Sequence, residues 1–178
     1  MSALALTALI LSLHVAITDL YARRVSNVAL ALALTAGLCW ILTSQADHSL
    51  PLAVVGLGVG LLTLLPFRLI RWMGAGDVKF FSTLGFLLGW KALVSIWVVA
   101  SIIAGIHAAL VISVMALQRR GHGRPPRCFR ALNLYLRRSV VWQRMREARQ
   151  GRHGIPYAAY LSIGTGSLLL QNGGSSHV

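Results

Sequence analysis

Six long apolar runs constrain this chain more than any other feature of its sequence. They occupy residues 2–17, 28–43, 51–67, 78–90, 92–117 and 155–171, with polar segments between them. A membrane-spanning helix needs about 20 apolar residues, or about 17 at the short end. Hydrophobic residues make up 56% of the chain and charged residues only 12%, which excludes an ordinary soluble domain. We therefore predict an all-α membrane helix bundle of about six transmembrane helices, without a sheet, as a single domain over residues 1–178.

The fourth run is the shortest, because only the segment from Phe80 to Trp90 separates Lys79 from Lys91. At about 1.5 Å per residue this segment crosses about half of a 30 Å hydrocarbon layer. We expect the fourth helix to include residues beyond these ends or to lie inside the bundle. In the third run, "GLGVG" has the small-xxx-small spacing that lets helices approach closely in lipid, which predicts close packing.

The basic residues lie almost entirely on alternate loops. Of the 17 Lys and Arg residues, 16 follow this pattern and Lys91 alone falls opposite. The positive-inside rule puts these loops in the cytoplasm and both termini outside. It also accounts for the net charge of +13 without nucleic acid as a partner. Cys39 and Cys128 form no C-x-x-C pair, so neither a zinc site nor a disulfide framework is predicted.

Eleven of the arginines lie in one segment, residues 118–154, which we expect to be a cytoplasmic loop. Two interpretations of this loop stay open. It is either a solvated connector whose charge maintains topology, or an interfacial helix that binds anionic lipid through an apolar face. The residues of that face would be Leu132, Leu136, Val140 and Trp142.

The chain has only four acids, and two of them lie at the predicted membrane border. Asp19 ends the first span and Asp77 begins the fourth, both on the predicted cytoplasmic side, whereas Asp47 falls on the other side. A carboxylate at membrane depth costs roughly 2.5–3.5 kcal/mol, so such acids usually have a partner or a task. Two structural roles compete with a functional one. Asp19 could pair with Arg23 at i, i+4, and Asp77 could cap the N-terminus of a helix.

If the helices bring the two aspartates together, they form a dyad that shares one proton. The ionised member can then take a proton from water while the protonated member donates to a scissile carbonyl, without a metal or other cofactor. Gly74 and Gly76 would let a substrate approach Asp77 closely, or would only break the helix. Lys79 would lower the pKa of an adjacent acid, pair with a lipid phosphate, or fix the end of a span.

Four segments resemble the type IV prepilin peptidases, a family of membrane aspartyl proteases. "GAGDVK" matches their G-x-G-D-x-K signature, and "TDLYARRVSN" resembles their first-aspartate motif, with Val25-Ser26 where Ile-Pro is commoner. "LGFLLG" and "HGIPYAAYLSIG" resemble the segment after the second aspartate and the last helix. The four segments occur in the family's order between residues 18 and 164. The resemblance implies a catalytic pair with supporting motif residues: Asp19 and Asp77, with Arg24, Asn27, Gly74, Gly76 and Lys79.

The resemblance also implies a reaction and a location. The basic leader of a prepilin would be cut at the cytoplasmic face of the bacterial inner membrane, ahead of its hydrophobic stem. The chain resembles the small peptidases of tight-adherence (Flp-type) pilus systems. Because no insertion with paired cysteines precedes the first motif, we do not expect N-methyl transfer. The expected partners are the prepilin leader and stem, and anionic lipid at the basic loops. The pilin, the oligomeric state and the aspartate that holds the proton stay open.

Three other functions compete with this one. Proteases of the signal-peptide-peptidase or presenilin type share the G-x-G-D motif, but their partner acid follows a tyrosine, and here it follows Thr18. A small transporter could use the aspartates to relay protons, and should keep polar residues through the midplane, where only His14 and His107 qualify besides hydroxyls. A silent assembly scaffold would tolerate Asp→Asn at both positions.

Overall fold

The computed structural model describes residues 2–43, 49–71, 73–119 and 157–174. These residues form six helices and no strand: α1 (Ala3–Ala22), α2 (Asn27–Thr43), α3 (Leu50–Leu69), α4 (Ala75–Leu88), α5 (Trp90–Arg119) and α8 (Tyr157–Gly174). The all-helical prediction is therefore confirmed for the described part of the chain. Among its helices, α1, α3 and α5 are long and apolar enough to cross a membrane. The prediction of six transmembrane helices is thus supported only in part.

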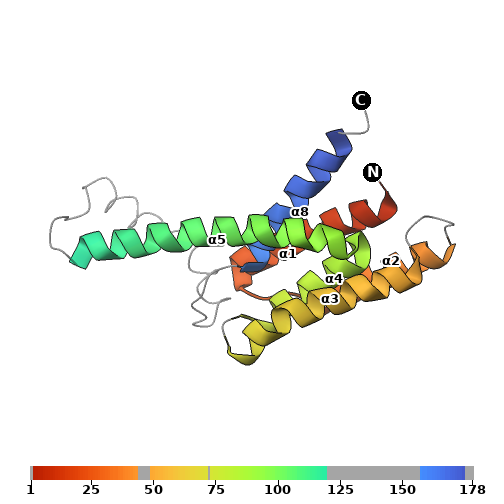
Figure 1. Ribbon diagram of the computed structural model, residues 1–178, viewed down its shortest axis with the longest axis horizontal. Helices are drawn as coiled ribbons and strands as arrows, with labels where there is room; N and C mark the ends of the chain where they lie inside the picture. Colours follow the sequence, from red (N-terminus) through yellow and green to blue (C-terminus); the bar gives the residue numbers. More distant parts are fainter. Residues whose placement is uncertain (1, 44–48, 72, 120–156, 175–178) are drawn as a thin grey trace.

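Helix α4 lies at the centre of the described helices and contacts each of the other five (Figure 1). Every residue from Phe80 to Leu87 is buried. A helix that is apolar on all sides is stable only where neighbours cover all its faces. The expectation that the short fourth helix lies inside the bundle is confirmed. The helix is therefore surrounded by other helices from Phe80 to Leu87, whereas Ala75 and Lys79 at its start are exposed.

Glycines let α3 pack backbone to backbone against α4. A methyl group on Gly56 would lie 2.1 Å from the carbonyl oxygen of Gly85, and one on Gly85 would lie 2.2 Å from the carbonyl oxygen of Gly56. One turn further along, a methyl group on Gly60 would lie 2.8 Å from the Cα of Ser82. The close packing predicted from the spacing of Gly56 and Gly60 is confirmed.

A glycine also separates α4 from α5. Gly89 has a φ of 81°, which L side chains rarely adopt, and its N–H donates to the Gly85 carbonyl at 2.9 Å. The chain turns there and continues as α5, which at about 1.5 Å per residue is about 45 Å long. Figure 1 shows one end of α5 extending well past the other helices. The rest of α5 packs against α3, α4 and α8.

Much of the predicted basic loop at residues 118–154 lies outside the described residues. Gln118 and Arg119 belong to the end of α5, and the description of the chain resumes at Tyr157. The two interpretations of the loop, including the proposed apolar face, stay predictions. The same is true of the expectation that residues 1–178 form a single domain. Asp47 and Glu147 also lie outside the described residues.

Candidate active site

A tight turn between α1 and α2 carries the first of the two predicted motifs. Arg23 caps α1 in the left-handed conformation, with φ 51° and ψ 45°, and its N–H donates to the Asp19 carbonyl at 3.0 Å. Three residues later, the Ser26 hydroxyl accepts the N–H of Ala29 at 3.4 Å. A serine in this position satisfies a free donor of the first helical turn and starts α2. The chain therefore reverses direction within a few residues of Asp19.

The second motif forms the start of α4. Gly74 is the N-cap, with φ −69° and ψ 146°, so Asp77 is the third residue of the helix. The alternative that Asp77 is itself the N-cap is wrong. Its carboxylate instead accepts a hydrogen bond from the Gly74 backbone N–H, as an acid in the first turn often does. The φ of Gly74 is open to any residue, so its backbone conformation does not require a glycine.

The two motifs are in direct contact. A methyl group on Gly76 would lie 2.9 Å from Cβ and 3.0 Å from Cγ2 of Val25, in the α1–α2 turn. The Lys79 ammonium donates to Oδ1 of Asn27 at 3.2 Å, which joins α4 to the first residue of α2. Gly76 was expected either to let a substrate approach or to break the helix. Instead it lies within α4, and Val25 occupies the space beside it.

Asp19 points into the bundle from the last turn of α1. The residue is buried, with 7% of its surface exposed, and its Oδ2 accepts the backbone N–H of Ala159 at 3.2 Å. Ala159 lies in the first turn of α8, whose N–H groups have no partner within the helix. A carboxylate is favoured there because it satisfies one of these donors and meets the positive end of the helix dipole. Helix α8 thus holds a carboxylate that comes from α1.

Asp77 lies outside the three helices of membrane-spanning length, at the start of α4. Burial, followed by the charge of Asp19, raises the pKa of the Asp77 carboxyl from 3.8 to about 7, against the opposing effect of the Gly74 N–H. The structure therefore brings the two aspartates close enough for the charge of one to act on the other. Two carboxyl groups coupled in this way do not both ionise readily near neutral pH.

Two tyrosines of α8 lie beside the aspartates. Tyr157 is within the electrostatic reach of Asp77, and its hydroxyl lies 3.5 Å from that of Ser101 on α5. Tyr160 is within reach of Asp19, and its hydroxyl is hydrogen-bonded to Nδ1 of His107 on α5. These two contacts attach the start of α8 to α5. They fix the helix that supplies the Ala159 N–H to Asp19.

Sequence analysis did not identify the contribution of α8. The segment "HGIPYAAYLSIG" was matched only as the last helix of a family, with no role for its residues. The donor to Asp19 is a backbone N–H, which every residue except proline supplies, so residue type carries no signal for it. Of the two histidines named above as polar residues of the spans, His107 is hydrogen-bonded to Tyr160. His14 is exposed on the outside of α1.

The remaining motif residues occupy the edge of the site. Arg24 is exposed in the α1–α2 turn. Lys79 is also exposed, and its ammonium is directed toward α2. Lys79 is not among the causes that set the pKa of Asp77, which is raised, so the expected lowering by Lys79 is not found. Among the residues that the structure describes, no group of three or more His, Cys, Asp or Glu is arranged to hold a metal ion.

Comparison with known protein families identifies one match. The model of the type IV leader peptidase family matches residues 6–109. This range covers more than half of the chain and includes both aspartates and the turn that joins α1 to α2. No curated protein and no solved structure matches the chain.

Proposed function

The chain belongs to the type IV leader peptidase family, and we propose that it is an aspartic endopeptidase that removes the basic leader of prepilins. Cleavage takes place at the cytoplasmic face of the bacterial inner membrane. Family membership favours a protease over a transporter or a silent scaffold. The observation that carries the aspartic mechanism is the coupling between the Asp19 and Asp77 carboxyl groups across α1 and α4.

The surroundings of the two acids favour different roles. The Ala159 N–H donates to Asp19, and a hydrogen bond to a carboxylate favours its ionised form. Burial and the charge of Asp19 raise the pKa of Asp77 to about 7, so a large part of it is protonated near neutral pH. Asp19 is therefore the general base and Asp77 the general acid, as in other sites where the environment separates two carboxyl groups.

The reaction consists of two proton-coupled steps. Asp19 takes a proton from water while the water oxygen attacks the scissile carbonyl carbon, and Asp77 gives its proton to the carbonyl oxygen. In the second step Asp19 gives its proton to the leaving amide nitrogen, Asp77 recovers a proton from the hydroxyl group, and the C–N bond breaks. Both acids return to their starting states, and no covalent intermediate with the enzyme forms.

The position of the acids at a predicted membrane border supports a prepilin as the substrate. The hydrophobic stem of a prepilin lies in the bilayer, and its basic leader stays on the cytoplasmic side, where the positive-inside rule also puts Arg23, Arg24, Arg68 and Arg71. The scissile bond between leader and stem is thereby held at the depth of Asp19 and Asp77. The new N-terminus is expected to leave without N-methylation.

Co-expression with a candidate prepilin tests this proposal. We expect Asp19→Asn and Asp77→Asn each to abolish leader removal, measured as a mass shift of the pilin, because neither acid alone performs both proton transfers. Asp47→Asn is the matched control, since it makes the same change in an acid predicted on the opposite side of the membrane. Retained cleavage in Asp19→Asn or Asp77→Asn would contradict the dyad. A pilin whose N-terminus is 14 Da heavier than expected would contradict the absence of methyl transfer.

A further inference from the structure

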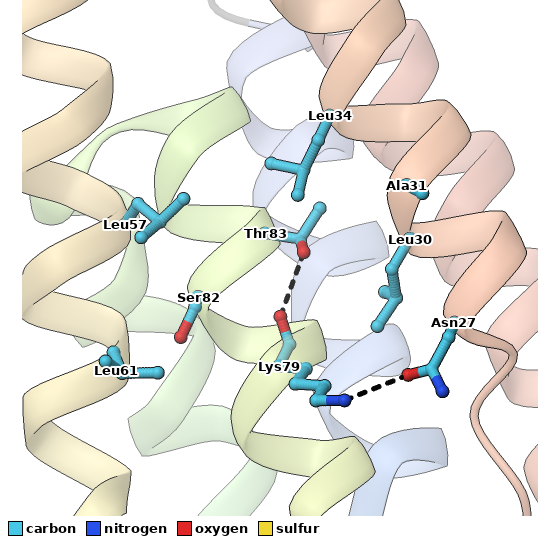
Figure 2. A pocket seen from close by; sticks show the side chains of 9 residues that line it. All are labelled: Asn27, Leu30, Ala31, Leu34, Leu57, Leu61, Lys79, Ser82 and Thr83. Atoms are coloured by element: carbon cyan, nitrogen blue, oxygen red, sulfur yellow. Dashed lines mark hydrogen bonds between the residues drawn. The ribbon is translucent and has the colours of Figure 1, made fainter.

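A groove of about 340 Å³ lies on the outside of the bundle between α2, α3 and α4 (Figure 2). It exists because α2 and α3 both pack on α4 but make little contact with each other. On one side, Gly56 and Gly60 let α3 pack closely against α4. On the other side, Gly37 lets α2 do the same, since a methyl group on Gly37 would lie 2.6 Å from a methyl group of Leu87. Helix α4 therefore forms the floor, and α2 and α3 form the walls.

The walls and the floor of the groove are apolar along most of its length. Four leucines line the walls, two from each helix: Leu30, Leu34, Leu57 and Leu61. The floor has two hydroxyl groups, but both donate to their own helix. Ser82 donates to the Val78 carbonyl at 2.8 Å. Thr83 donates to the Lys79 carbonyl at 2.9 Å (Figure 2). Because both hydroxyl groups donate within α4, the groove presents a mainly apolar surface that suits a hydrocarbon chain.

One end of the groove is polar and positively charged. Lys79 and Asn27 lie there, with the ammonium bonded to the amide oxygen at 3.2 Å (Figure 2). An ammonium group has three N–H donors, so two remain for an anion. The amide nitrogen of Asn27 points away from Lys79 and supplies further donors (Figure 2). No carboxylate is among the described residues that line the groove, so nothing there opposes a negative charge.

The length of the groove fits one leaflet of a bilayer. Asn27 and Leu34 mark its ends along α2, and seven residues at about 1.5 Å each span about 10 Å. Half of a hydrocarbon core of about 30 Å is about 15 Å. We propose that this groove binds one anionic phospholipid, with the phosphate at Lys79 and Asn27 and an acyl chain along the leucines. A transmembrane helix about 30 Å long would extend far beyond the groove and has no phosphate to bind at the polar end.

Photolabelling in vesicles tests the proposal independently of proteolysis. The probe is phosphatidylglycerol with a photoactivatable group in one acyl chain, and the full-length chain is reconstituted and labelled before peptide mapping by mass spectrometry. We expect labelling at the walls, around Leu30–Leu34 and Leu57–Leu61. Lys79→Gln should lower it about fivefold, the effect of one basic side chain on an anionic lipid. Arg68→Gln, an exposed cation on α3 that does not line the groove, should leave labelling unchanged.

Two further variants test the apolar part without a change of charge. Leu57→Trp and Ala31→Phe fill the groove from α3 and from α2, and both should reduce labelling severalfold while the circular dichroism of the helices is unchanged. If Leu57→Trp does not fold, Ala31→Phe and Lys79→Gln still test the proposal. Equal labelling by a phosphatidylcholine probe, full competition by millimolar inorganic phosphate, or displacement of the lipid by a pilin stem peptide would each overturn the proposal.

Discussion

Val25 lies directly against Gly76, so that a methyl group on the glycine would come within 2.9 Å of the valine Cβ. This contact joins the turn after Asp19 to the helix that begins before Asp77. The spacing of the two motifs therefore depends on the absence of a side chain at residue 76. The lysine and asparagine one helical turn further, Lys79 and Asn27, form a second link between the same two segments.

The first prediction concerns this contact. Gly76→Val should push the α1–α2 turn away from α4 and lower the rate of leader cleavage, because added volume at a tight contact typically costs 1–3 kcal/mol. A rate reduced tenfold or more is expected, measured with purified enzyme and a prepilin substrate. Val25→Gly, which removes both contacting atoms, should restore part of the rate in the double variant. Equal rates for Gly76→Val and the wild type would show that the contact does not set the geometry of the site.

The second prediction compares two glycines of α3. Gly56→Ala should destabilise the fold by about 1–3 kcal/mol or more, because its methyl group would lie 2.1 Å from the Gly85 carbonyl oxygen. Gly58→Ala is the matched control, since a methyl group there meets nothing within 4 Å. Thermal unfolding in detergent, followed by circular dichroism, measures both. If the two variants unfold at the same temperature, α3 and α4 do not pack through their backbones.

The third prediction concerns pH and stability. The pKa of Asp77 in the folded chain is about 7, above its ordinary value of 3.8. A carboxyl group with a raised pKa stabilises the fold fully at low pH, and this contribution is lost as the pH rises from about 4 to about 7. The unfolding temperature should therefore fall over this range. Asp77→Asn does not titrate and should lose most of this dependence, whereas a wild-type chain that becomes more stable over the same range would contradict the raised pKa.

The same pKa sets an expectation for activity. If Asp77 is the general acid, the cleavage rate should fall as the pH rises through about 7, because the acid loses its proton. The measurement is the rate of leader removal by the wild-type enzyme in reconstituted membranes between pH 5 and pH 9. A rate that rises steadily to pH 9 would assign the acid role elsewhere.

The fourth prediction concerns the backbone donor from α8. Ala159→Pro removes the N–H that donates to Asp19, and a hydrogen bond to a charged group contributes about 1.5–3 kcal/mol. Cleavage should fall by tenfold or more. Ala158→Pro is the matched control, because it puts a proline at the neighbouring buried position of the same helical turn and keeps the Ala159 N–H. Equal losses in the two variants would indicate a general effect of proline on α8.

Sequence analysis identified the described helices because each coincides with an apolar run. It also anticipated that α4 is buried, since the segment between Lys79 and Lys91 is too short to cross a bilayer alone. The alternative in which Asp77 caps α4 is wrong, since the cap is Gly74 and Asp77 lies in the first turn, where an acid is also stabilising. Sequence analysis did not anticipate that Val25, from another segment, lies against Gly76.

The sequence by itself determined the all-helical class, the family, and the two aspartates as the acids to consider, because apolar runs and a scarcity of carboxylates are properties of the chain alone. The tertiary structure decided that Asp19 and Asp77 interact, and that Ala159 of α8 donates to one of them. It also decided that α2 and α3 leave a groove over α4. These relationships join segments far apart in the chain, and they depend on how closely helices pack, which no local pattern of residues records.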